Sequence, residues 1–336
     1  MTIKELIEAF KRLSIFLKTP SAQLSALKQK AYFHNNWFTE TNVDLAFNSI
    51  ADNFLNEKKI NKWLKAYSER KNMDISKPQI VGLVMAGNIP LVGFHDLLCV
   101  LFSGNKAFIK LSSKDNILLP FITEVLISYN SKFEDYIVFG ERLKPMDAVI
   151  ATGSNNSARY FDYYFKKYPH LIRKNRGSVA VLNGSESKED ILNLGKDIFQ
   201  YFGLGCRNVS KLYVPFDYDF VALLDILEAF KSVDSLGKYK NNYDYNRTIL
   251  LMNKTPHLAS DFLMIYEDDR IVSPIATLHY AYYVDEDDLQ LKLESQATEI
   301  QCVVGNNFPV PFGNTQHPQL WDYADNVDTM KFLLSL

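Results

Sequence analysis

The sequence predicts an α/β protein in which a doubly wound, mostly parallel sheet is followed by a second α/β domain. Short β-rich runs alternate with longer helical runs from about residue 79, and the same alternation resumes after residue 175. A chain of 336 residues is also long enough to form two domain cores. Strands and helices that alternate at this spacing favour parallel pairing through right-handed crossovers. A nucleotide is the usual ligand of such a sheet.

The elements follow one another in a regular order. Residues 1–75 have a loosely amphipathic helical pattern, and we expect them to pack as a leader on the first domain. Residues 76–175, the expected nucleotide-binding domain, contain strands at 79–85, 106–111, 136–139 and 148–152 and helices at 91–102, 116–129 and 155–168. Residues 176–320, the expected catalytic domain, begin with strands at 178–182 and 211–214 and helices at 188–202 and 220–231.

Two segments are less regular. Residues 232–247 are polar and rich in tyrosine, which predicts a long surface loop, with a lid as the alternative. Residues 321–336 are apolar and could form an edge strand or helix at an oligomer interface, or could pack within the chain.

Composition excludes several classes of protein. Lys and Arg number 37 against 39 Asp and Glu, so the net charge of −2 gives no general attraction to nucleic acid. Three widely spaced cysteines form no disulfide framework and no zinc-ligand pair, which favours a reducing cytoplasm and predicts no metal. The N-terminus lacks the apolar core of a signal peptide, and no apolar run approaches the ~18 residues of a membrane span.

Cys206 is the first candidate for chemistry, since it lies between Gly205 and Arg207. Glycine lets the backbone approach a ligand closely, and a neighbouring guanidinium favours the nucleophilic thiolate. The alternative is a small buried core residue near a turn. Cys99 and Cys302 lie in apolar sequence surroundings, and we expect both to be buried and inert. His95 and His279 are expected to be packed and hydrogen-bonded rather than catalytic.

Two strand-to-helix junctions are candidate phosphate sites, although neither a Gly-x-Gly-x-x-Gly nor a Gly-Lys-Ser/Thr loop is present. The first is 86–90, where Gly87 permits a sharp exit from the strand and Pro90 suits the first helical turn. The second contains Gly153 and Ser154, with free amides at a helix N-terminus. The alternative for each is ordinary helix capping.

These residues resemble a known family. The stretch 81–116 resembles the cofactor-domain pattern of the aldehyde dehydrogenase superfamily, and Cys206 falls where the catalytic thiol of that superfamily falls. Within that superfamily, the sequence is most similar to LuxC-type acyl-CoA reductases in three motifs, 203–210, 268–275 and 320–330. The resemblance covers about residues 75–336 and implies an aldehyde dehydrogenase-like fold with the active site between the two domains.

The resemblance also implies a mechanism. The Cys206 thiolate would attack an acyl-CoA thioester, and a reduced nicotinamide would convert the acyl-cysteine to the aldehyde. The Asn88 amide and the Cys206 backbone N–H would stabilise the oxyanion. The cofactor would be held at Lys110, Ser112 and Ser113 and at the Gly153–Ser154 turn. NAD-preferring relatives have a carboxylate where Ser113 stands, so we expect NADPH.

Two departures from the aldehyde-oxidising pattern bear on the reaction. The stretch 173–178 contains no carboxylate where those enzymes have a water-activating glutamate, which favours reduction over hydrolysis. Its cations could contact CoA phosphates or form a solvated basic face. Arg270 stands near the position at which oxidising relatives hold the nicotinamide ribose with a glutamate.

The alternatives are aldehyde oxidation, acyl-phosphate reduction and a non-catalytic acyl-CoA-binding protein. The superfamily resemblance also favours a homo-oligomer, either a dimer or a tetramer. Acyl chain length and the natural acyl donor do not follow from the sequence.

Overall fold

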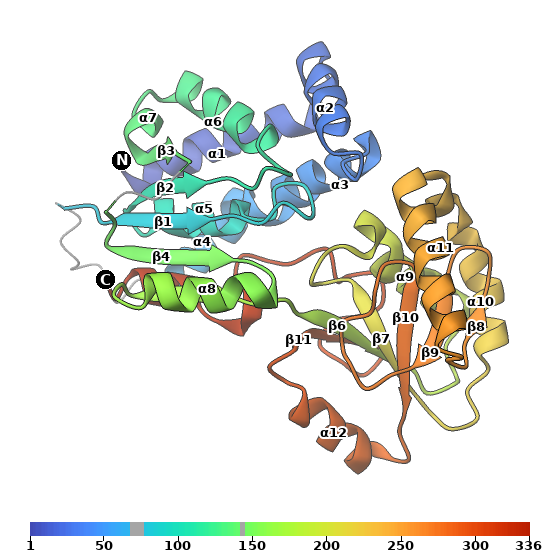
Figure 1. Cartoon of the computed structure of the whole chain (residues 1–336). Helices are drawn as coiled ribbons and strands as arrows, with labels where there is room; N and C mark the ends of the chain where they lie inside the picture. The colour runs from blue at the N-terminus through green and yellow to red at the C-terminus, as the bar shows by residue number, and fades with distance from the viewer. Residues whose placement is uncertain (68–76, 142–144) are drawn as a thin grey trace. The chain divides into compact units, whose positions relative to one another are not determined.

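The computed structural model describes residues 1–67, 77–141 and 145–336. The chain forms two compact units, one made of residues 1–175 together with 318–336 and the other of residues 176–317 (Figure 1). The first unit is therefore discontinuous in sequence. The boundary at residue 75, expected between the leader and the first domain, lies outside the described residues.

The N-terminal segment is helical, as predicted. Its helices are α1 (Ile3–Lys18), α2 (Ala22–His34), α3 (Glu40–Ser49) and α4 (Glu57–Lys65). A capping box starts α1, because the Thr2 side chain accepts from the Glu5 backbone and the Glu5 side chain accepts from Thr2. The rings of Phe10 and Phe102 lie 5.6 Å apart in the core of the first unit, so these helices share its core.

The first unit contains a five-stranded parallel sheet, and its described strands lie in the order β3-β2-β1-β4-β5. Figure 1 shows β3, β2, β1 and β4 side by side in this order. The bounds are β1 (Ile80–Val84), β2 (Lys106–Lys110), β3 (Ile137–Phe139), β4 (Ala148–Thr152) and β5 (His170–Arg173). The four predicted strands are present, whereas β5 was not predicted. Successive strands run outward from β1 to β3, and the chain then returns to the other side of β1, so the strand order reverses between β1 and β4.

Helices cover this sheet. They are α5 (Phe94–Phe102), α6 (Leu118–Tyr129), α7 (Phe133–Tyr136) and α8 (Asn155–Phe165). The sequence predicted that α5 begins at Leu91, but it begins three residues later. Leu91 has a φ of 56°, in the left-handed region, and its backbone N–H donates to the Asp115 carboxylate instead of entering a helix.

The second unit contains a six-stranded sheet in the order β11-β6-β7-β10-β9-β8. The bounds are β6 (Gly177–Val181), β7 (Val209–Val214), β8 (Leu258–Ala259), β9 (Met264–Glu267), β10 (Thr277–Tyr282) and β11 (Ile300–Val304). All described pairs in it are parallel except β8 with β9. Three of its helices are α9 (Lys188–Phe199), α10 (Phe220–Leu227) and α12 (Glu286–Ser295).

The predicted loop or lid at 232–247 is wrong. A 3-10 helix (Glu228–Ser235) leads into a sixteen-residue helix, α11 (Gly237–Met252). Tyr239 and Tyr243 are buried on one side of α11, and their hydroxyls donate to backbone carbonyls of Phe262 and Ser260. The tyrosines that made the segment look polar therefore anchor a helix, because their rings are apolar and their hydroxyls find buried acceptors.

The C-terminal segment belongs to the first unit. Its helix α13 (Thr329–Leu333) packs against α5, and Met330 and Leu333 are buried in the core of the first unit. Tyr323 accepts a hydrogen bond from the Trp63 ring N–H at 2.6 Å. The predicted role at an oligomer interface stays a prediction. Among the described residues, none of the helices has the length and apolar character that crossing a bilayer requires.

Candidate functional site

The predicted cofactor-binding residues of the first unit follow three neighbouring strands. In the sheet register Val84 pairs with Lys110 on one side and with Ala151 on the other. The carboxyl ends of β2, β1 and β4 therefore meet at one edge, at the point where the strand order reverses. In open α/β sheets ligands bind at this switch point. The turn after β1 contains Asn88, and the turn after β4 contains Gly153.

Two glycines at this edge occupy positions where a side chain would collide. A Cβ on Gly87 would lie 2.8 Å from the Ser112 Cβ, so the loops after β1 and β2 are in close contact. A Cβ on Gly153 would lie 2.9 Å from the Ser157 Cβ at the start of α8. Ser154 caps α8, since its Oγ accepts from the Ser157 N–H at 3.2 Å. Small residues and a helix N-terminus at one sheet edge fit the phosphates of a dinucleotide.

The loop after β2 is held from the N-terminal segment. The His34 ring lies 2.6 Å from the Ser113 carbonyl oxygen through its Nε2, and the Asn35 amide donates to the Lys114 carbonyl at 3.2 Å. The Ser113 side chain stays exposed. The end of α2 therefore fixes the backbone of the loop that was predicted to distinguish NADPH from NADH. Sequence patterns gave no signal for this contact, because 79 residues separate His34 from Ser113.

Asp115 lies in the loop after β2 and connects it to the loop after β1 by a hydrogen bond. Its carboxylate is 6% exposed and accepts from the Leu91 N–H at 2.8 Å, whereas its Oδ1 has no partner among the described residues. Burial raises the pKa of Asp115 to about 6, although the backbone hydrogen bonds act to lower it. The Asn88 turn is therefore supported by a carboxyl group that titrates near neutral pH.

This pKa predicts a pH-dependent stability of the first unit. Because the folded-state pKa is raised, the folded state binds the proton more tightly, and the stabilisation is complete below pH 4 and is lost as the pH rises through 6. The loss is roughly 3 kcal/mol of unfolding free energy. We expect D115N to remove this dependence.

Urea unfolding between pH 4 and 7, followed by tryptophan fluorescence, measures the effect in the first unit, because Trp37, Trp63 and Trp321 all lie there. D147N is the matched control, since Asp147 also accepts a backbone N–H but is exposed. Parallel pH profiles for wild type and D115N would contradict the prediction.

In the second unit, Cys206 lies on a tight turn between α9 and β7. The Asn208 N–H donates to the Gly205 carbonyl at 3.0 Å and closes the turn around Cys206 and Arg207. The Asn208 side chain accepts from the Gly205 N–H at 2.8 Å. Cys206 is half-buried, whereas Asn208 is buried. The thiol is thus carried on a fixed backbone.

Ser178 holds the other side of this turn. Its hydroxyl donates to the Cys206 carbonyl at 3.1 Å and lies 2.9 Å from the Cys302 sulfur. Since the single hydroxyl proton is used on the carbonyl, the Cys302 S–H is the donor to Ser178. Burial raises the pKa of Cys302, while Arg207 acts to lower it. The expectation that Cys302 is buried is wrong, because it is half-buried and hydrogen-bonded, whereas Cys99 is buried as expected.

The stretch 173–178, which contains no carboxylate, does not form the predicted basic face at its first residue, Arg173. Arg173 is buried, and its Nη2 donates to Asp96 at 2.6 Å and to the Thr329 hydroxyl at 2.8 Å. A guanidinium buried in this way is not available for CoA phosphates, because leaving Asp96 unpaired in the core is costly. Lys174 is exposed. His95 and His279 are hydrogen-bonded as expected, and His279 is fully buried.

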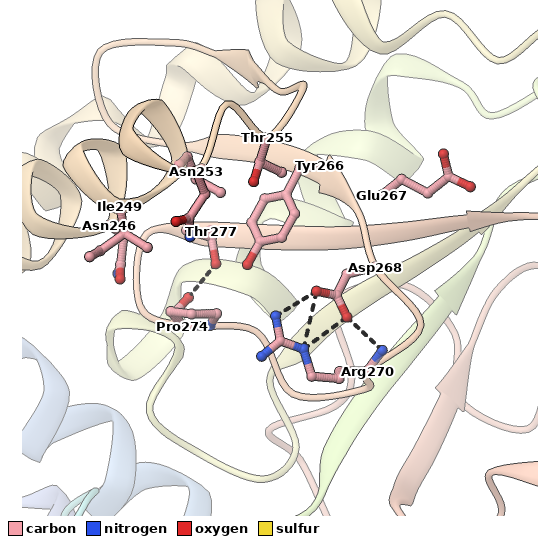
Figure 2. Close-up of a pocket in the computed structure, with 11 residues that line it drawn as sticks. Asn246, Ile249, Asn253, Thr255, Tyr266, Glu267, Asp268, Arg270, Pro274 and Thr277 are labelled. Atoms are coloured by element: carbon pink, nitrogen blue, oxygen red, sulfur yellow. Dashed lines mark hydrogen bonds and ion pairs between the residues drawn. The ribbon is translucent and has the colours of Figure 1, made fainter.

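A separate cavity of about 230 Å³ lies in the second unit, between α11 and the segment that follows β9 (Figure 2). Figure 2 shows the Asp268 carboxylate and the Arg270 guanidinium facing one another at its edge, with Arg270 Nε 2.9 Å from Asp268 Oδ1. Hydrogen bonding to Arg270 lowers the pKa of Asp268 to about 2. Tyr266 lines the cavity and its hydroxyl lies 2.8 Å from Nε2 of His279. None of the predicted catalytic or cofactor-binding residues lines this cavity.

Comparison with known proteins identifies the family. The model of the acyl-CoA reductase (LuxC) family matches residues 46–222, more than half of the chain. The long-chain acyl-protein thioester reductase 2 of Photobacterium leiognathi is 23% identical in an alignment of 180 residues that covers 48% of this chain. The matched part spans 37% of that protein's length.

Solved structures agree on the fold. Aldehyde dehydrogenase 21 from Physcomitrella patens, in complex with the reaction product succinate, aligns over all of this chain and 84% of its own, with a TM-score of 0.65 and 12% identity. The NAD+ complex of an aldehyde dehydrogenase from Bacillus cereus covers 90% of this chain and 72% of its own, with a TM-score of 0.61 and 10% identity. The fold is therefore that of the aldehyde dehydrogenases, as predicted. The family match adds the narrower assignment: this chain is a member of the LuxC acyl-CoA reductase family.

Proposed function

We propose that this protein reduces an acyl thioester, acyl-CoA in the first instance, to the aldehyde with NADPH through an acyl-cysteine on Cys206. The observation that carries the proposal is the Cys206 turn, whose backbone is fixed by Asn208 on one side and Ser178 on the other. A thiol held in this way is suited to covalent catalysis, which needs a positioned nucleophile. The family match and the relative that is named a thioester reductase support the same reaction class.

The residues have separate roles in this proposal. The Cys206 thiolate attacks the thioester carbon, the carbon–sulfur bond to CoA breaks, and CoA leaves as its thiolate. The Asn88 amide and the Cys206 backbone N–H are the proposed donors to the oxyanion that forms. NADPH would be held at the Gly87, Ser112 and Gly153 edge and would supply the hydride. The hydride would add to the acyl carbon, the carbon–sulfur bond to Cys206 would break, and the aldehyde and the Cys206 thiolate would be released. The missing carboxylate at 173–178 leaves hydrolysis without a nearby base from that stretch.

Product analysis tests the reaction. The full-length protein is incubated with acyl-CoAs of graded length, an acyl phosphate and an aldehyde, each with NADPH or NADP+ as appropriate. We expect aldehyde from acyl-CoA and NADPH, and an acyl mass added to the Cys206 peptide when the nucleotide is omitted. Product from acyl phosphate alone, or only carboxylate from aldehyde, would favour the rival activities. No adduct with any donor would favour a non-catalytic binding protein.

Ser113 gives a test of cofactor choice. Its exposed hydroxyl stands beside Lys114, and we expect kcat/KM to favour NADPH over NADH. S113E places a carboxylate near the 2′-phosphate, so kcat/KM with NADPH is expected to fall by about 10- to 100-fold while kcat/KM with NADH changes little. S113Q, which has similar size and no charge, is the control. A wild-type preference for NADH, or an S113E enzyme whose preference for NADPH is as large as that of wild type, would rule out the assignment.

A further inference from the structure

The backbone that leads into Cys206 follows an unfavourable path. After α9 ends at Phe199, Tyr201 and Phe202 have φ values of 53° and 58°, and Gly203 has a φ of 74°. Only Gly203 adopts this left-handed conformation without steric cost. Strained residues of this kind persist when the surrounding contacts determine the conformation, and they cluster at functional sites. The contacts that impose this path therefore also fix the position of Cys206.

The Asn208 side chain joins the end of α9 to the turn that contains Cys206. The Asn208 amide donates to the carbonyls of Asp197 at 2.9 Å, Ile198 at 3.3 Å and Gln200 at 2.8 Å. The end of a helix leaves its last carbonyls without partners inside the helix, and Asn208 caps them. Its Oδ1 accepts from Gly205 at 2.8 Å, so the same side chain also joins the turn that contains Cys206. Asn208 is 2% exposed, so these hydrogen bonds lie away from bulk solvent.

An asparagine is the residue type that this arrangement requires. The three carbonyls need a donor and the Gly205 N–H needs an acceptor, and a short amide provides both from one Cβ. Aspartate has the same shape and keeps the acceptor, but it lacks the NH₂ group. Serine is too short to reach both the helix end and the turn. We infer that Asn208 is the positioning residue that holds Cys206 in place for acylation, an inference that rests on the proposed function.

The test compares N208D and N208S with wild type in the full-length protein. N246D is the matched control, because the Asn246 side chain also donates to a backbone carbonyl of the second unit, that of Ile275. Circular dichroism establishes which variants are folded. If N208D does not fold, N208S is used in its place. Single-turnover acylation of Cys206 by an acyl-CoA is measured by mass spectrometry after rapid quenching.

We expect acylation to slow by about 100-fold in both Asn208 variants, the effect of moving a reacting group by about 1 Å. NADPH affinity is expected to be unchanged, since its predicted site lies in the first unit, and N246D should acylate at the wild-type rate. Hydrogen exchange of the peptide around Gly205 is expected to accelerate in N208S, because that variant loses the Oδ1 acceptor. Exchange should remain slow in N246D. Wild-type acylation rates in folded N208D and N208S would overturn the inference.

A second measurement separates this inference from the proposed function. Iodoacetamide alkylates a reactive thiol without any acyl donor. If wild type is not acylated by any donor, the proposed function fails, and the alkylation rate of Cys206 then tests its positioning alone. A changed rate in both variants with an unchanged rate in N246D supports Asn208 as the positioning residue, whereas equal rates overturn that role.

Discussion

Replacing Cys206 with alanine is expected to abolish both covalent acylation and aldehyde formation, a loss of at least about 10⁴-fold in kcat. The proposed reaction has no route around the acyl-cysteine, because hydride reduction in this scheme acts on the thioester that Cys206 forms. The measurements are incorporation of a radiolabelled acyl group and gas chromatography of the aldehyde. Binding of NADPH should persist, since the predicted cofactor residues lie in the other unit.

C302A is the matched control for this experiment. The Ser178 hydroxyl contacts both the Cys302 sulfur and the Cys206 carbonyl. Removing the Cys302 thiol therefore perturbs the neighbourhood of the turn without removing the proposed nucleophile. We expect C302A to keep acylation on Cys206. Aldehyde production by C206A, or an acyl label that follows Cys302 instead, would refute the assignment of the nucleophile.

The second large effect is expected at the buried ion pair of the first unit. R173M removes the guanidinium that serves both Asp96 and Thr329 and leaves the Asp96 carboxylate buried without its cation. Removing one partner of such a pair costs about 3–5 kcal/mol of unfolding free energy. Urea unfolding followed by tryptophan fluorescence reports the change. Burial raises the pKa of Asp96 and Arg173 opposes that rise, so the unpaired carboxyl should bind a proton in R173M.

The double variant D96L/R173M tests the explanation. Replacing both charges with apolar side chains removes the unpaired charge, so the double variant should be more stable than R173M alone. K132M is a control for loss of a surface cation, because Lys132 pairs with Glu5 in solvent, and it should leave the unfolding free energy nearly unchanged. An R173M protein as stable as wild type would show that the pair contributes little.

Local patterns predicted β1 to β4 of the first unit and β6 and β7 of the second, with the main helices between them, because buried parallel strands are short apolar runs and the helices between them are long. The short strands β8, β9 and β11 of the second unit were not predicted. The strand β5 was not predicted, since its four residues begin with His170 and end with Arg173. Arg173 itself was interpreted as part of a basic face because its partner, Asp96, is 77 residues away in the sequence. Long-range pairing of this kind has no local signature.

The candidate site was likewise predicted only in part from the sequence. Glycines and small polar residues after β1 and β4 indicated the edge of the sheet, and the structure places these turns at one switch point. The residues that hold the site in place were not found from the sequence. They are His34, which contacts the loop after β2, Asp115, which accepts from the loop after β1, and Asn208, which accepts from the turn that contains Cys206. Each acts on a backbone group, and backbone partners cannot be read from side-chain patterns.

The discontinuity of the first unit has a consequence for biosynthesis. The ribosome delivers residues 176–317 in full before it delivers residues 318–336, which contribute Leu320, Met330 and Leu333 to the earlier core. Domains tend to fold as units while the chain is being made. The second unit can therefore fold while the first still exposes the apolar surface that α13 will cover. That surface is the part of the nascent protein on which we expect chaperones to act.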